Sequence, residues 1–315
     1  MGLTHDGKSP ILMENNMNID KIKTFADGCY SEIKLVSEYM KQRIPLIDGV
    51  IKNPSTPYRD DCLKVLFLRA NVWIQTLVKL NQPNDFQAIC AANRALLEIT
   101  VDIYLLHHDK TDNSGQMMYW WMQSAKIKSA QTILEYYNKM KISLPKEHQI
   151  IQEFYEHNKT DVEKKRIEFW SSKKNPNNPR HPERWTGKSS LIGDVKIVDQ
   201  YYGSDIKNDL GRSLEEFYSI EYQKLNWYIH SGITGSWGMT SEGFHIICGS
   251  AYTYCADFGM LCTKVLLSDF GFIDILDGLR REWDQIKNNR KLAFLKKNPF
   301  LVENIRKQMQ TIIEE

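Results

Sequence analysis

The period of the apolar residues constrains the fold of this chain more than any other feature. Between 244 and 267, apolar residues recur at alternating steps of four and three, the period of one face of an α-helix: Ile247, Ala251, Tyr254, Phe258, Leu261 and Val265. The same period runs through most of the chain, at 18–44, 59–81, 86–108, 115–140 and 146–170, and no alternating strand pattern of useful length interrupts it. The sequence therefore predicts an all-α fold, a helical bundle with elaborations.

Prolines and polar stretches divide the expected helices. The first helix is expected to end before Pro45, a long basic loop to cover 171–190, and a sixth helix to cover about 211–230. The tail from 272 is expected to hold two or three shorter helices. We expect three parts: a flexible N-terminal extension over 1–17, a helical bundle domain over 18–270 and a C-terminal helical extension over 271–315.

The charge balance restricts the partners of the chain. It has 315 residues and a net charge of only +2, so it is not a polycation. Lys and Arg nevertheless outnumber Asp and Glu by ten to five between 159 and 196, and by seven to two between 280 and 297. Any affinity for nucleic acid must come from such local patches.

The cysteine spacing indicates the redox compartment of the chain, and the longest apolar segment indicates whether the chain spans a membrane. Cys248, Cys255 and Cys262 are seven residues apart, so on a helix they form one stripe about 10 Å apart and cannot share a metal ion. We interpret them as small buried apolar residues, and we expect a reducing, cytoplasmic compartment and no signal peptide. The segment 244–267 is long enough to span a bilayer but contains Asp257 and Lys264, so we expect a buried bundle helix and no membrane partner.

Three charged residues lie on one face of the expected helix 86–108. Arg94, Glu98 and Asp102 are four residues apart on an otherwise apolar helix, which is costly unless the charges pair or serve a site. The alternative to a site is an internal Arg94–Glu98 salt bridge that fixes the helix register.

His230 ends an aromatic-rich run, YQKLNWYIHSG. Tyr222 and Asn226 precede it by eight and four residues, and Ser231 follows. An imidazole at the mouth of a site can transfer protons near neutral pH. The alternative is a helix cap, in which the imidazolium meets the negative end of the helix dipole.

The loop 171–190 ends in RHPERWTGKSS. Basic residues surround an indole there, which suits a ligand that carries phosphate and can stack: Arg180, His181, Arg184 and Lys188 around Trp185. In the alternative interpretation, Trp185 plugs the bundle and the charges are solvated.

These three motifs together resemble a known layout. RALLE at 94–98, RWTGKS at 184–189 and the Tyr-x7-His of 222–230 resemble a bacterial all-α family of unknown function, over roughly 60–265. That layout is similar to HEPN domains, helical bundles that bind nucleotides. Many of these are metal-independent ribonucleases of toxin and anti-phage systems and act as dimers. Asn226 and His230 match the polar residue and the histidine of the HEPN motif, whereas Leu225 stands where that motif has arginine.

The resemblance implies a metal-independent endoribonuclease without a cofactor. His230 would act as general acid or base on a ribose 2′-hydroxyl, and Arg94 would stabilise the charge on phosphorus. Asn226 would orient the phosphate or the imidazole, and Glu98 would hold Arg94. The residues expected to contact the substrate are Tyr222, Arg180, Arg184, Trp185, Lys188 and Ser231.

The departure at Leu225 leaves a second function open. The same residues would then form a non-catalytic sensor or interaction module that binds RNA or a nucleotide, or the Arg94–Glu98 pair would be scaffold alone. The resemblance also implies a homodimer. The aromatic stretch YWWM at 119–122 supports this, because it is more apolar than the surface of a single bundle.

Overall fold

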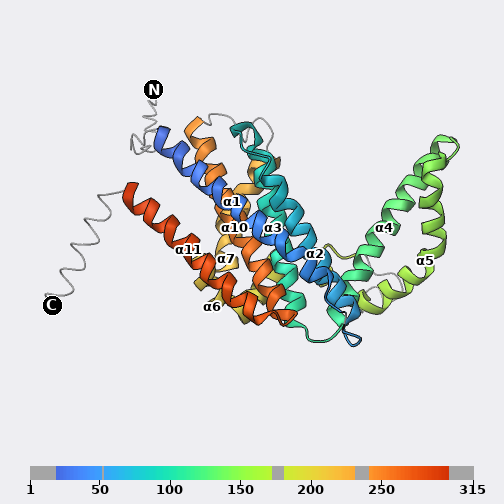
Figure 1. Ribbon diagram of the computed structural model, residues 1–315. Helices are drawn as coiled ribbons and strands as arrows, with labels where there is room; N and C mark the ends of the chain where they lie inside the picture. The colour runs from blue at the N-terminus through green and yellow to red at the C-terminus, as the bar shows by residue number, and fades with distance from the viewer. Residues whose placement is uncertain (1–18, 52, 172–180, 231–240, 298–315) are drawn as a thin grey trace, which may run out of the picture.

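The chain folds into a body of packed helices from which a two-helix arm projects (Figure 1). The computed structural model describes residues 19–51, 53–171, 181–230 and 241–297; for a few of these, His230 among them, it describes the backbone alone. The regular structure in these ranges is helical throughout, with no β-strand, which confirms the all-α prediction.

Two long helices form the centre of the body. They are α3 (Phe86–His108) and α10 (Ser241–Asp269), which pack on each other, while α1 (Ile19–Asp48) lies along α10 and α2 (Pro57–Leu77) contacts α1, α3 and α10. α3 begins after a short 3-10 turn, Pro83–Asp85. Because α3 and α10 are covered by other helices, both are rich in apolar residues on more than one side.

The prediction of a buried helix over 244–267 is confirmed by α10. Its cysteines Cys248, Cys255 and Cys262 are buried free thiols, and burial raises the pKa of Cys248 and Cys262 to about 12. Within the ranges that the structure describes, no helix is both long and apolar enough to cross a bilayer. Gly259 lets α1 approach closely, since a Cβ there would lie 3.0 Å from Val36 Cγ1 and 3.2 Å from Met40 Sδ.

The arm consists of α4 (Asn113–Met140) and α5 (Gln149–Trp170), joined by a turn that contains the 3-10 segment Lys146–His148. Figure 1 shows that it projects away from the body. Along α5 only Val162 is buried among the side chains described, and this helix packs chiefly on α4. The arm therefore depends on its base for its orientation.

Several expected boundaries were wrong. α1 does not end before Pro45 but continues to Asp48. The proline lacks one amide donor, yet its carbonyl accepts from Gly49 N at 3.0 Å, and Ile47, the residue before the last of the helix, is fully buried. The tail forms one helix over 273–297, α11 (Ile273–Lys297), rather than shorter ones. Its Leu276, Leu279 and Trp283 join the core of the body.

The segment between the arm and α10 also differs from expectation. A helix that we did not expect, α6 (Leu191–Leu210), directly follows the basic loop and buries Val195, Val198 and Ile206. The single helix expected over 211–230 is divided into α7 (Leu214–Phe217), the π-helical turn η3 (Tyr218–Tyr222) and α8 (Gln223–His230). The π turn adds a residue to the helical repeat and so rotates Tyr222 relative to a regular helix.

Gly115 should be required for stability, because it allows the start of α4 to lie on the start of α2. A Cβ at Gly115 would lie 2.2 Å from Arg59 N and 2.5 Å from Arg59 Cα, so backbone would have to move. We expect Gly115→Ala to lower the free energy of unfolding by about 1–3 kcal/mol or more, measured by urea denaturation.

The matched control is Gly28→Ala on the exposed side of α1, where a Cβ meets nothing within 4 Å. It should leave stability unchanged or raise it by up to about 1 kcal/mol, because alanine favours helix. Equal effects of the two substitutions would contradict the close approach of α2 and α4.

Candidate functional site

The predicted charged face of α3 is present, and its two ends have different surroundings. Arg94 Nε donates to Glu98 Oε1 at 3.1 Å, and the two side chains are 34% and 35% exposed. Asp102, one turn further along, is largely enclosed. The Arg94–Glu98 salt bridge that we considered as an alternative therefore exists, but at the surface, where a ligand can reach it.

The π turn brings Tyr222 onto this pair. The Tyr222 hydroxyl donates to Glu98 Oε1 at 2.9 Å, and the Arg94 guanidinium carbon lies 5.4 Å from the centroid of the Tyr222 ring. Burial and the Glu98 charge raise the pKa of Tyr222 above its usual range, so the phenol remains a donor at neutral pH. Glu98 thus accepts from both neighbours, so Arg94, Glu98 and Tyr222 form one group. The expected cluster of Arg94 and Glu98 with His230 stays a prediction, because the His230 side chain lies outside the described residues.

Asp102 anchors the basic loop to the body. Trp185 Nε1 donates to Asp102 Oδ1 at 2.8 Å, and Arg184 bridges Asp102 and Asp194, with Nε 2.8 Å from Asp194 Oδ2. Thr186 adds a hydrogen bond to Asp194 at 2.7 Å. Burial raises the pKa of Asp102 to about 6, although Arg184 and Trp185 offset part of that effect.

The same loop holds the base of the arm. Trp121 of α4 donates to the Pro182 carbonyl at 2.9 Å and stacks on His181, and Trp170 of α5 donates to the Trp185 carbonyl at 3.0 Å. Trp185 itself is buried, with no open ring face for a base. Trp185 and Arg184 therefore join loop, arm and body here, and a ligand role for either would require the loop to open.

Two of the expected residues, Asn226 and His230, lie on α8, and Tyr222 directly precedes that helix. Asn226 follows Tyr222 by four residues, and its buried Oδ1 has no hydrogen-bond partner among the described residues. His230 is the last residue of α8, about 12 Å along the helix axis from Tyr222. Its side chain lies outside the described part of the chain. Leu225 is buried in the core.

The remaining expected ligand contacts are one exposed lysine and two residues that are not described. Lys188 lies on the basic loop and is exposed. Arg180 and Ser231 fall outside the described residues. Among the side chains that are described, no three His, Cys, Asp or Glu are gathered as metal ligands would be.

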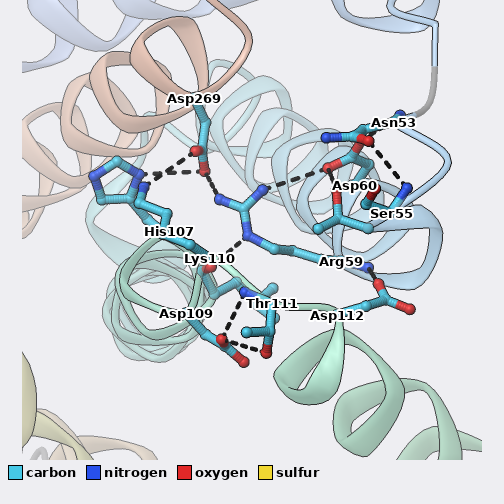
Figure 2. Close-up of polar contacts among 12 residues, drawn as sticks. Asn53, Ser55, Arg59, Asp60, His107, Asp109, Lys110, Thr111, Asp112 and Asp269 are labelled. Atoms are coloured by element: carbon cyan, nitrogen blue, oxygen red, sulfur yellow. Dashed lines mark hydrogen bonds and ion pairs between the residues drawn. The ribbon is translucent and has the colours of Figure 1, made fainter.

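A second charged cluster, which we did not predict, joins three helix ends around buried Arg59 (Figure 2). Arg59 Nη2 lies 2.5 Å from Asp269 Oδ2 at the end of α10, and Arg59 Nε donates to the Leu106 carbonyl in the last turn of α3 at 2.8 Å. A cation at a helix C-terminus satisfies a carbonyl that has no partner within the helix. The cluster thus fixes the start of α2 on the ends of α3 and α10.

His107 and Lys110 complete this cluster. His107 Nδ1 lies 3.2 Å from Asp269 Oδ2, and Lys110 Nζ lies 3.7 Å from Asp269 Oδ1. Burial opposes ionisation of Asp269, but the neighbouring His107 and Arg59 outweigh it and hold the pKa below its usual range. Because Asp269 and Arg59 are 210 residues apart in sequence, no local pattern could have indicated the pair.

Asp102→Asn should change the pH dependence of stability. A raised pKa means that the folded state holds this proton where the unfolded state, near 3.8, has lost it. The contribution of Asp102 to the free energy of unfolding therefore falls as pH rises from about 4 to about 6. We therefore compare the free energy of unfolding of the wild type with that of Asp102→Asn. The difference, wild type minus variant, should fall by about 1–3 kcal/mol over this range.

Urea denaturation at a series of pH values measures this difference. Other carboxyls, such as Asp269, are present in both proteins and cancel in the subtraction. Parallel profiles would instead mean that Arg184 keeps Asp102 ionised throughout the range.

Comparison with known proteins identifies no family for this chain. No family model, curated protein or solved structure matches the chain. The function must therefore be argued from the residues that the fold brings together.

Proposed function

We propose that this chain is a HEPN-like bundle that binds RNA or a nucleotide, through a phosphate, on the face formed by α3 and α8. The observation that carries the proposal is the double hydrogen bond to Glu98: Arg94 from α3 and Tyr222 before α8 meet on one carboxylate at the surface. A guanidinium held in this way is oriented before a ligand arrives, so a planar bidentate contact with phosphate costs less entropy.

Asn226 is a second observation in favour of ligand binding on this face. A buried amide oxygen without a partner costs free energy, and a ligand donor, such as a ribose hydroxyl or a base amino group, would remove that cost once a local movement exposes the oxygen. With His230 at the end of α8, the polar positions cover about 12 Å. A ligand with several polar groups fits such a row better than a single ion.

The residues of this face favour binding over catalysis, because the arginine on it is paired with a carboxylate. Glu98 neutralises Arg94, so this pair contributes less to a phosphorane than an unpaired arginine would. The position that holds arginine in the HEPN motif is Leu225, buried among apolar residues. Neither feature prevents binding.

Arg94→Ala should weaken the binding of labelled single-stranded RNA roughly tenfold, the value of a charge-assisted hydrogen bond at a partly exposed site. Filter binding measures this. Tyr222→Phe keeps the cation but removes one donor to Glu98, and should give a smaller loss.

The matched control is Arg69→Ala, an exposed arginine on α2. It removes the same formal charge and should change the affinity much less. Equal affinities of wild type and Arg94→Ala, for RNA and for free nucleotides, would exclude this face.

A second candidate is metal-free RNA cleavage, and the position of His230 favours it. Through the Tyr222–Glu98 bond, α3 is tied to the helix that ends at this histidine. His230 would take the proton of the 2′-hydroxyl as O2′ bonds to phosphorus. The P–O5′ bond then breaks and O5′ takes a proton, leaving a 2′,3′-cyclic phosphate and a 5′-hydroxyl.

Incubation of labelled RNA with EDTA across about pH 6 to 9 tests this step. Cleavage to a cyclic phosphate that is lost in His230→Ala establishes it. Intact RNA with the binding behaviour above leaves the chain as a binding module.

On the same resemblance we propose a cytoplasmic homodimer with a role in a toxin or anti-phage system. The YWWM stretch no longer adds support, because Tyr119 packs on Tyr58 with ring centroids 5.0 Å apart and Trp121 bonds the basic loop of its own chain. Light scattering at micromolar concentration tests the dimer.

A further inference from the structure

The tip of the arm is the part of the described structure that lies furthest from the body on that side (Figure 1). α4 ends at Met140, and Lys141, in the left-handed conformation with φ 55°, turns the chain toward α5. The tip is here defined as residues 136–150. Among the described helices, α5 packs chiefly on α4, so the tip consists of these two helices and the turn between them.

Four large apolar side chains of the tip face solvent. Tyr136, Met140, Ile142 and Ile150 are 55%, 51%, 52% and 70% exposed. Tyr136 and Met140 are one helical turn apart on α4, and the two isoleucines flank the turn. Apolar groups gathered in this way on a projecting element are typical of an interaction surface.

The charges of the tip indicate that its partner is anionic. Between 136 and 150 there are three lysines, Lys139, Lys141 and Lys146, against one acid, Glu147, and all three lysines are exposed. Lysines beside aliphatic and aromatic side chains suit the boundary of an anionic bilayer, where the stems lie along the apolar groups and the ammonium groups reach the phosphates.

We propose that the tip of the arm docks on an anionic lipid surface. The apolar residues would enter the headgroup region, and the three lysines would contact lipid phosphates. RNA would also attract the lysines, but Ile142, Ile150 and Met140 have no counterpart on a surface of phosphates and base edges, so these residues favour lipid. Contact of this kind needs no spanning helix. It departs from our expectation of no membrane partner, which rested on the sequence of one helix.

Sedimentation of the full chain with vesicles tests the proposal. The protein should bind vesicles of phosphatidylcholine with phosphatidylserine, bind pure phosphatidylcholine weakly, and dissociate as salt increases. Ile142→Glu with Ile150→Glu should lower vesicle affinity roughly tenfold or more, from the apolar area that no longer enters the lipid. Lys139→Gln with Lys141→Gln should lower it about fivefold for each lysine.

Exposed apolar residues of the body provide the matched control. Val72 on α2 is 61% exposed and Ile273 on α11 is 55% exposed, and Val72→Glu or Ile273→Glu should leave vesicle binding unchanged. Circular dichroism checks that each variant is folded.

Three outcomes would overturn the proposal. The wild type remains in the supernatant with phosphatidylserine vesicles, or the body variants lose as much binding as the tip variants. In the third outcome, the lysine variants lose RNA affinity while vesicle binding stays the same, which would assign the tip to RNA. The vesicle results do not depend on Arg94, so this test can fail without affecting the α3–α8 proposal.

Discussion

A charge inside a helical bundle must meet a charge of opposite sign, and this requirement determines how the chain is assembled. Asp102 and Asp194 are buried carboxylates, and Arg184 lies between them. Removing one partner from such a group leaves an uncompensated buried charge, at a cost of about 3–5 kcal/mol. The Arg184 contacts hold the loop, the loop holds Trp121 and Trp170, and these two residues hold the arm. The position of the arm therefore depends on a pair of carboxylates in the body.

α3 carries two kinds of charged site on one face. At one end, Asp102 is enclosed and its partners complete the fold. One and two turns away, Glu98 and Arg94 are a third exposed, where water screens the pair and the interaction stabilises the protein little. A surface pair that contributes little to stability, yet is reinforced by a phenol from another helix, is better explained by ligand binding than by packing. The same spacing of four residues thus supports structure at one position and, under the proposed function, recognition at the other.

Sequence reasoning was accurate for strongly periodic helices and for pairs within one helix. It failed where burial outweighs local propensity and where a contact spans the chain. The period of apolar residues located α3 and α10, and a spacing of four placed Arg94 beside Glu98. α6 was missed because Gly193, Gly203 and several β-branched residues weaken the helix signal, although burial of its apolar face outweighs those propensities. The Arg184–Asp102 contact joins residues 82 apart, and no local pattern encodes such a pairing. Trp185, which we expected to stack on a ligand, instead donates a hydrogen bond to Asp102 inside the fold.

The arrangement of α5 has a consequence for local unfolding. With one buried side chain among those described and contacts chiefly to α4, this helix has little apolar area to lose when it opens. Proteins open in cooperative units whose free energies range from near zero to that of global unfolding. The arm is such a unit: its amides should exchange with solvent through openings that leave α3 and α10 closed. A partner that binds the tip would slow that exchange along both arm helices, so protection of the α5 amides reports occupancy of a surface more than one helical turn away.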